Sequence, residues 1–282
     1  FAWAGASRAV AAAGVPPLPA RPLAAVAELG GVPVPLRGGG ALALDLYRPR
    51  GNAVVPLVVA IYGGAWAFGS RAGVAPLARW YAARGYAVAA IDYRHAPRCR
   101  FPAQLDDVED ALRALALHAR AWHADPARVA LFGRSAGGQL ALLAAQRPQP
   151  LDVRAVVGYY APTDLVRGYA DPPRPDPAGV RRILSAYLGG PPDARHAAAY
   201  ERAAPLAHAG TTPAALLVIG ARDQLVRPAF QRAFAARLRA AGKRVVALEL
   251  PWANHAFDEV DGLGAALARD ATLRFLDATL RP

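Results

Sequence analysis

The sequence predicts an α/β fold with a mostly parallel, doubly wound sheet. Two observations lead to this prediction: short apolar segments alternate with helical segments along the chain, and these short segments are apolar at every position rather than at alternate ones. Strands of that kind are buried on both faces, so helices must cover both sides of the sheet. A chain of 282 residues also fits one large α/β domain.

The first strand-like pattern begins at residue 41, where Leu42, Leu44 and Leu46 alternate with other residues before a turn at residues 49–52. Further apolar runs predict strands at residues 56–61, 86–91, 128–132, 155–160, 214–219 and 245–250. Helical patterns occupy residues 74–84, 103–122, 136–146, 228–241 and 263–280. Each helix therefore follows a strand, as a parallel sheet requires.

Two regions depart from this alternation. Residues 1–40 are rich in Ala, Pro and Gly, which predicts an N-terminal arm with a short helix near residues 7–13. Residues 164–212 contain the segment DPPRPDP, and only residues 180–188 there have a helical pattern. This stretch is too long for a connecting loop and too short for a domain, so we expect an inserted cap or lid on a single domain spanning residues 1–282.

A candidate nucleophile lies between a predicted strand and a predicted helix. The segment GRSAG at residues 133–137 fits the pattern G-x-S-x-G, in which small residues permit a strained turn that exposes the serine. The helix that starts at Ala136 would favour developing negative charge at this turn. A glycine–serine turn alone also arises by chance, so the assignment of Ser135 depends on finding its partners.

A serine hydroxyl is a poor nucleophile without a base, and the base needs a carboxylate to orient it. Proteins with this serine turn place the acid and then the histidine later in the chain. His255 follows the strand at residues 245–250, at the sheet edge where ligands bind in open α/β sheets. We assign His255 as the base and Asp223 as the acid, with Asp164 and Asp258 as alternative acids.

The segment YGGAW at residues 62–66 directly follows the predicted strand that ends at Ile61. Acyl transfer places negative charge on the former carbonyl oxygen, and backbone N–H groups can stabilise that charge. We assign this oxyanion-binding role to the N–H groups of Gly63, Gly64 and Ala136.

These segments together resemble the hormone-sensitive-lipase-like branch of the α/β-hydrolases and related bacterial carboxylesterases and acetyl esterases, from about Leu42 to the C-terminus. DYRHAP at residues 92–97 and FPAQ at residues 101–104 also look like the DYRLAP and FPA segments of that family. The resemblance implies hydrolysis of short-chain carboxylic esters through an acyl-enzyme, without a metal or organic cofactor. It further implies that the cap shapes the pockets and that Asp92 and Arg94 brace the oxyanion loop.

The chain departs from the family pattern at two positions. Tyr62 stands where the family usually has His, so the hydrogen bond that braces the oxyanion loop must be replaced or rerouted. Arg134 precedes the serine, where Asp or His is commoner, and would place a cation near the site. We therefore predict that Trp66 and Arg134 bind substrate, with Arg134 favouring anionic esters.

Composition limits the partners. The formal net charge is +12, but no run reaches the five or six like charges typical of interaction tails, so we expect a small-molecule ester substrate and no nucleic acid. Cys99 is the only cysteine in the sequence, which excludes an internal disulfide, and nothing around it resembles a nucleophile motif. A homodimer is compatible with these features.

No apolar run approaches the roughly 18 residues of a membrane helix, and no signal-peptide pattern is present, so we expect a cytoplasmic protein. The sequence contains no Met and begins at Phe1. We therefore expect that an upstream segment or methionines are missing, and an upstream segment could carry an export or anchor signal.

Two other functions compete with ester hydrolysis. Arylformamidases also contain a loop of this glycine–tryptophan type, so an amidase acting on small amides is the main alternative. A non-catalytic binding protein of the same fold would normally lack a member of the Ser, His and Asp set, and all three are present here.

Overall fold

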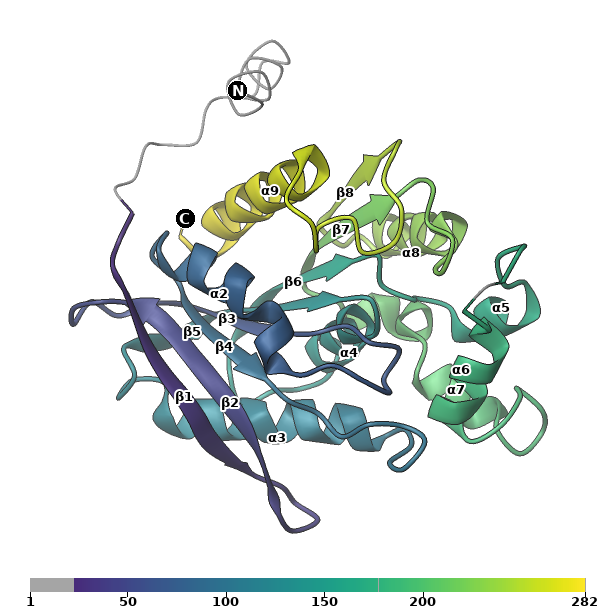
Figure 1. Ribbon diagram of the computed structural model, residues 1–282, viewed down its shortest axis with the longest axis horizontal. Helices are drawn as coiled ribbons and strands as arrows, with labels where there is room; N and C mark the ends of the chain where they lie inside the picture. Colours follow the sequence, from purple (N-terminus) through teal and green to yellow (C-terminus); the bar gives the residue numbers. More distant parts are fainter. Residues whose placement is uncertain (1–22, 177, 282) are drawn as a thin grey trace.

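The computed structural model describes residues 23–176 and 178–281. Its strands are β1 (Val26–Pro35), β2 (Ala41–Pro49), β3 (Val55–Ile61), β4 (Ala87–Ile91), β5 (Ala124–Arg134), β6 (Val153–Tyr159), β7 (Ala214–Gly220) and β8 (Val245–Leu250). They form one sheet in the order β1-β2-β4-β3-β5-β6-β7-β8 (Figure 1). Within this described sheet, β2 pairs in antiparallel fashion with β1 and with β4, and the other neighbouring strands are parallel. The predicted fold class is confirmed.

Helices cover both faces of the sheet. The α-helices outside residues 164–212 are α2 (Ala75–Ala82), α3 (Ala103–His118), α4 (Ala136–Ala145), α8 (Pro228–Ala240) and α9 (Leu263–Leu280), as far as the structure describes the chain. Figure 1 shows α2 and α9 on one face and α3 on the other, where α3 packs against α4. The central strands β3 and β4 are almost entirely buried, as their uniformly apolar sequences predict.

The sheet begins earlier than predicted, because the described part of the expected arm contains β1. This strand pairs with β2 in antiparallel fashion, with a register shift between Leu29 and Val32 at the Gly30-Gly31 step. Pro33 and Pro35 suggested an irregular arm, but an edge strand tolerates proline because one side of its backbone has no partner strand. The helix expected near residues 7–13 lies outside the described residues.

The region at residues 164–212 contains more helix than predicted. In addition to α6 (Val180–Leu188), which was expected, it contains α5 (Leu165–Ala170), α7 (Ala197–Arg202) and the 3₁₀ helix η2 (Pro205–Thr211). Helices of six or seven residues are too short to show a helical repeat of apolar positions. A further 3₁₀ helix, η1 (Arg71–Val74), precedes α2.

The register of the parallel strands brings their carboxyl ends to one edge of the sheet. Ile61 lies opposite Gly133, and Gly133 lies opposite Gly158. On the far side Gly220 lies opposite Leu250. The loops that follow β3, β5, β6, β7 and β8 therefore gather at the same edge, and all the candidate catalytic residues are on these loops.

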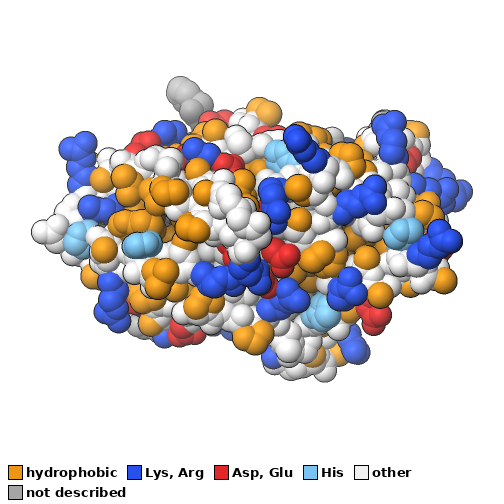
Figure 2. Space-filling view, turned by 90° about the horizontal axis from the view of Figure 1, so that it is seen from below, with side chains coloured by type: hydrophobic (Ala, Val, Ile, Leu, Met, Phe, Trp, Pro, Cys, Tyr) orange, Lys and Arg blue, Asp and Glu red, His pale blue; other side chains and the backbone are white. Residues whose placement is uncertain are grey.

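Figure 2 shows one face of the molecule, on which Lys and Arg side chains are spread among hydrophobic and neutral groups rather than gathered in one block.

Among the helices that the structure describes, none combines the length and the apolar character needed to cross a bilayer.

Candidate active site

Ser135 occupies a strained turn between β5 and α4. Its backbone has φ 49° and ψ −121°, a conformation that costs about 1–3 kcal/mol and that the surroundings must stabilise. Its N–H donates to the carbonyl of Tyr159 (2.9 Å), and its carbonyl accepts from the N–H of Gln139 (3.0 Å). Gly137 lies so close to β3 that a Cβ there would collide with the carbonyl oxygens of Ile61 and Tyr62. The glycine of the motif is therefore required for close packing.

Ser135, His255 and Asp223 form a hydrogen-bonded chain. The Ser135 Oγ lies 3.0 Å from His255 Nε2, and His255 Nδ1 lies 2.8 Å from Asp223 Oδ2. The other carboxylate oxygen of Asp223 accepts the N–H groups of Leu225 and Val226, both at 2.8 Å. A carboxylate fixed in this way holds Nδ1 as the protonated nitrogen, so the lone pair of Nε2 faces the serine hydroxyl.

The alternative acids have other roles. Asp164 is the N-cap of α5 and accepts the N–H of Arg167 (3.0 Å). Asp258 accepts the hydroxyl of Tyr160 (2.5 Å) and forms an ion pair with Arg134 (2.6 Å). Of the three carboxylates considered from the sequence, Asp223 is the one that the structure brings to His255.

The loop that carries His255 packs against the loop after β7. The N–H of Arg222 donates to the carbonyl of Ala253 (3.0 Å), and that of Ala221 donates to Leu250 at the end of β8 (3.0 Å). The ring of Tyr160 contacts the His255 ring, with centroids 4.6 Å apart and planes at 60°. Sequence reasoning missed Tyr160, although its position directly after β6, at the edge that holds the other candidates, was a usable signal.

The backbone of the loop after β3 lies beside Ser135. A Cβ on Gly63 would lie 3.2 Å from the Cβ of Ser135. Gly64 has φ +125°, which favours glycine, and its carbonyl accepts from Ala67 and Phe68 in a tight turn (2.9 and 3.1 Å). Ala136 is the first residue of α4, so its N–H has no acceptor within the helix. Gly63 and Ala136 thus adjoin the serine, and Gly64 shapes the loop.

Tyr62, which stands where the family usually has His, holds this loop through different hydrogen bonds. Its hydroxyl lies 2.9 Å from His95 Nε2 and donates to the carbonyl of Tyr93 (3.2 Å). The rings of Tyr62 and Tyr93 are stacked, 4.3 Å between centroids. Burial raises the pKa of Tyr62 well above its usual value, so the hydroxyl keeps its proton.

In the DYRHAP segment, Asp92 and Arg94, which were expected to brace the loop after β3, bind residues just beyond or outside that loop. The carboxylate of Asp92 binds Arg71 at the start of η1, including the Arg71 N–H at 2.8 Å, and the N–H of Arg94 donates to Asp107 (2.8 Å). Tyr93, His95 and Ala96 hold the loop after β3 more directly, the last through an N–H bond to the Trp66 carbonyl (2.8 Å). Successive residues of this segment thus contact two different parts of the molecule: Asp92 and Arg94 bind charged residues elsewhere, and Tyr93 and His95 contact Tyr62.

Trp66 lines the pocket next to Ser135, but its side chain is only 3% exposed because other residues pack against it. Its Nε1–H donates to Gln139 Oε1 (2.9 Å), and its ring stacks on Tyr187 of α6 with centroids 4.1 Å apart. Gln139 also donates to the carbonyl of Ala203 (2.6 Å). Gln139 and Tyr187 were missed from the sequence because their partners are distant along the chain.

Arg134 does not point into this pocket, contrary to its predicted role in substrate binding. Its side chain is 9% exposed and pairs with the carboxylate of Asp258, which neutralises its charge. It is absent from the described residues that line the pocket. The cation beside Ser135 is paired with Asp258, so an attraction for anionic esters loses its basis.

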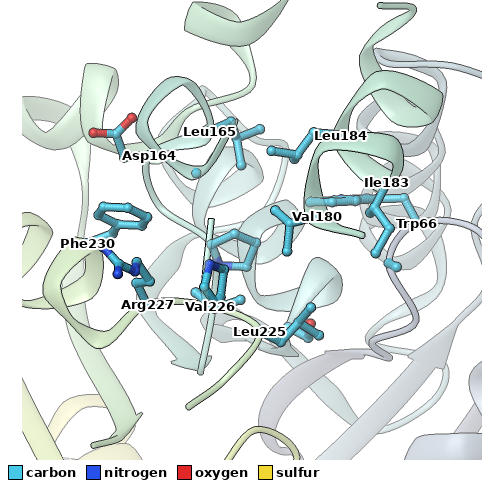
Figure 3. A pocket seen from close by; sticks show the side chains of 15 residues that line it. Trp66, Asp164, Leu165, Val180, Ile183, Leu184, Leu225, Val226, Arg227 and Phe230 are labelled. Atoms are coloured by element: carbon cyan, nitrogen blue, oxygen red, sulfur yellow. The ribbon is translucent and has the colours of Figure 1, made fainter. Parts of the chain in front are cut away.

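A pocket of about 540 Å³, part of which is open to solvent, extends from Ser135 toward the helices of residues 164–212. Apolar side chains of α5 and α6 face those of the segment after β7 across it (Figure 3). The lining residues beyond Trp66 and Ser135 include Leu165, Val180, Ile183, Leu184, Leu225, Val226 and Phe230. Among the described residues, no group of three or more His, Cys, Asp or Glu side chains could hold a metal ion.

Comparison with known proteins relates this geometry to esterases. Over 256 residues the chain is 34% identical to Esterase LipC of Mycobacterium tuberculosis, which covers 84% of the chain and 62% of LipC. It is 33% identical to the probable carboxylic ester hydrolase LipM of the same organism, over 84% of the chain and 58% of LipM. The chain thus spans about three fifths of the length of these relatives.

Among solved structures, a hyperthermophilic esterase from the archaeon Pyrobaculum calidifontis superposes with a TM-score of 0.78 at 25% identity, covering 92% of this chain and 87% of that one. Residues 44–238 match the BD-FAE family model. Because that match covers more than half of the sequence, the chain belongs to the BD-FAE family, within the α/β-hydrolase carboxylesterases.

Proposed function

We propose that this protein hydrolyses carboxylic esters with short acyl chains through an acyl-enzyme on Ser135. The observation that carries the proposal is the hydrogen-bonded chain from Ser135 through His255 to Asp223. The esterases among its relatives support the same chemistry. Because the chain spans about three fifths of these relatives, we propose this activity for the whole protein rather than infer it from them directly.

In the first half of the reaction, His255 Nε2 takes the proton of Ser135 as the Oγ attacks the ester carbonyl carbon. Asp223 keeps the imidazole oriented and stabilises the imidazolium. Collapse of the tetrahedral intermediate breaks the bond to the alcohol oxygen, which receives the proton from His255. In the second half, His255 takes a proton from water as the water oxygen attacks the acyl-enzyme, and the proton returns to Ser135 when the acid leaves.

The N–H groups of Gly63, Gly64 and Ala136 would bind the oxyanion. Support comes from the position of Gly63 beside Ser135 and from Ala136 at the start of α4, where the helix dipole also favours negative charge. Loss of one such donor typically lowers kcat by about 10² to 10³.

We propose that residues 164–212 act as a cap and that their apolar side chains hold the apolar part of the substrate. The contacts of Trp66 with Tyr187 and Gln139 tie this cap to the oxyanion loop. A cap held in that way limits the pocket, which favours short acyl chains over long ones. Self-association into a homodimer and a cytoplasmic location stay predictions.

The direct test is hydrolysis of p-nitrophenyl acetate, butyrate and decanoate by the wild type and by Ser135→Ala, with burst kinetics and a matched p-nitroanilide. We expect activity that falls with acyl length, a burst of nitrophenol, little amide turnover, and loss of all of these in Ser135→Ala. Replacing one triad member typically leaves only the residual rate from oxyanion binding, about 10³-fold or more below wild type. Wild-type turnover no faster than that of Ser135→Ala would refute the proposal.

A further inference from the structure

A buried ion pair joins the strand that presents the nucleophile to the loop that presents the histidine. Arg134 is the residue immediately before Ser135, and Asp258 lies three residues after His255. The Arg134 Nη2 lies 2.6 Å from Asp258 Oδ2, and the two side chains are 9% and 1% exposed. An ion pair so far removed from water interacts strongly and leaves a costly unpaired charge if one partner is removed.

The pair is also connected to the His255 ring. Tyr160 donates its hydroxyl to Asp258 Oδ1 (2.5 Å), and its ring packs against His255. Burial first, and then the charge of Asp258, raise the pKa of Tyr160 well above its usual value, so this hydroxyl remains a donor. A single carboxylate is thus held by the strand before Ser135 and by the residue after β6.

Burial alone would lower the pKa of Arg134, but the negative charge of Asp258 outweighs it, and the pKa lies above its ordinary value. The Arg134 guanidinium therefore stays charged. Arg134 also lies within 3.5 Å of the Gly73 carbonyl in η1, which follows the oxyanion loop. The guanidinium thereby contacts elements on both sides of the nucleophile.

We infer that Arg134 and Asp258 are positioning residues whose ion pair fixes the His255 loop against the nucleophile turn, with Tyr160 as the contact that transmits this to the imidazole. The inference rests on the proposed esterase function. It assigns the arginine before Ser135 to alignment of the base rather than to recognition of substrate charge.

The pair also balances the charge around His255. In the described part of the chain, the imidazole contacts Ser135, Asp223 and Tyr160, and its own loop carries Asp258, paired with Arg134, and the exposed Glu259. Asp258→Asn would leave the Arg134 cation uncompensated, which disfavours the imidazolium. Arg134→Met would leave the Asp258 anion uncompensated, which favours it. The two substitutions therefore act on the base with opposite sign.

The experiment compares wild type, Asp258→Asn, Arg134→Met and the double variant in pH profiles of ester hydrolysis and in the rate of Ser135 labelling by diethyl p-nitrophenyl phosphate. The control is Arg154→Met with Asp152→Asn, an exposed ion pair at the start of β6. We expect each single variant to lose about 10- to 100-fold in kcat and in labelling rate with little change in KM, the size typical of a misaligned group. The acid limb of kcat/KM should move to lower pH in Asp258→Asn and to higher pH in Arg134→Met.

The double variant separates alignment from stability. Removing both charges should restore the melting temperature, because no unpaired charge remains, whereas kcat should stay low because the tether is absent. Full recovery of kcat in the double variant, or folded single variants with wild-type kcat and an unmoved acid limb, would overturn the inference. If Arg134→Met does not fold, Asp258→Asn carries the test, since it keeps the shape and an acceptor for Tyr160.

The two proposals fail in different ways. Ester turnover by the wild type tests the proposed function alone. The labelling rate of Ser135 reports its alignment with His255 whichever substrate the protein uses, so it tests the ion pair even for a protein that turns over no ester.

Discussion

The two sides of Ser135 are built from different interactions. On the oxyanion side, neutral hydrogen bonds and stacked rings hold the loop: Tyr62 binds Tyr93 and His95, and Trp66 binds Gln139. On the histidine side, the buried pair of Arg134 and Asp258 holds the loop. Neutral bonds are each worth about 1 kcal/mol and can be lost one at a time. When either partner of a buried ion pair is replaced, the charge of the other partner is left unpaired. That charge changes the pH dependence of a titratable group beside it.

This difference explains why one region tolerates an unusual residue. The oxyanion loop has Tyr62 in place of the usual His, and several neutral contacts share the task of holding it, so a single exchange can be absorbed. The contacts of the histidine loop include a buried ion pair, whose two members cannot be exchanged independently. Variants on the two sides should therefore differ both in the size of the effect and in its dependence on pH.

The largest effect on the oxyanion side should come from Gly137→Ala. The added methyl group would collide with backbone carbonyls of Ile61 and Tyr62, which cannot move without moving β3 and the oxyanion loop. We expect kcat to fall by about 10² to 10³, the cost of a lost oxyanion donor, and the protein to be less stable. Steady-state kinetics and thermal unfolding measure this, with Gly38→Ala as control because a Cβ there meets nothing within 4 Å. Equal kinetics for the two variants would contradict the packing argument.

Gln139→Leu should mainly reduce stability. The substitution leaves the Trp66 N–H and the Ala203 carbonyl without their buried partner, and each unpaired group costs about 1–3 kcal/mol. Because Gln139 links Trp66 to the Ala203 carbonyl in the proposed cap, KM should rise as well. Urea unfolding and KM for p-nitrophenyl butyrate test this, against Gln149→Leu, which removes one bond to the Ala144 carbonyl at a half-buried site. A loss no greater than in the control would show that Gln139 does not hold the cap.

Tyr62→Phe should be milder and, unlike Asp258→Asn, independent of pH. It removes the hydroxyl that meets Tyr93 and His95 but keeps the ring stacked on Tyr93. Two neutral bonds worth about 1 kcal/mol each predict a loss in kcat of at most about thirtyfold. The raised pKa of Tyr62 keeps the wild-type hydroxyl neutral, so the ratio of kcat between wild type and variant should stay constant across the pH profile. A ratio that changes with pH would place a charged group on this side as well.

The sequence was most informative where function depends on local geometry. The turn that carries Ser135 could be recognised from a strand, a glycine-rich segment and a helix that are adjacent in the chain, although the assignment of the serine also needed its partners. His255 and Asp223 could be chosen because parallel strands bring their carboxyl ends to one edge. The roles of Arg134 and Asp92 could not be assigned in this way, since each depends on a carboxylate or guanidinium contributed by another loop.

The same reasoning explains the errors in the fold. β1 contains two prolines and a Gly-Gly step, residues that rarely occur in strands, so its sequence did not predict a strand. Its only described partner is β2. The helices α5 and α7 are stabilised by contacts with neighbours rather than by an apolar repeat of their own. Elements at the edge of the sheet and in the insertion therefore depend on tertiary contacts that composition does not reveal.

His95→Leu should give the smallest effect and identify which bond braces the oxyanion loop. Without His95, the Tyr62 hydroxyl still donates to the Tyr93 carbonyl, so kcat should fall only about two- to threefold, the value of part of one neutral bond. Because both substitutions act on the same hydroxyl, the double variant Tyr62→Phe/His95→Leu should be no slower than Tyr62→Phe alone, which a double-mutant cycle measures. His208→Leu, on the exposed part of η2, is the control. A loss larger than that of Tyr62→Phe would instead make His95, and not the tyrosine, the residue on which the loop depends.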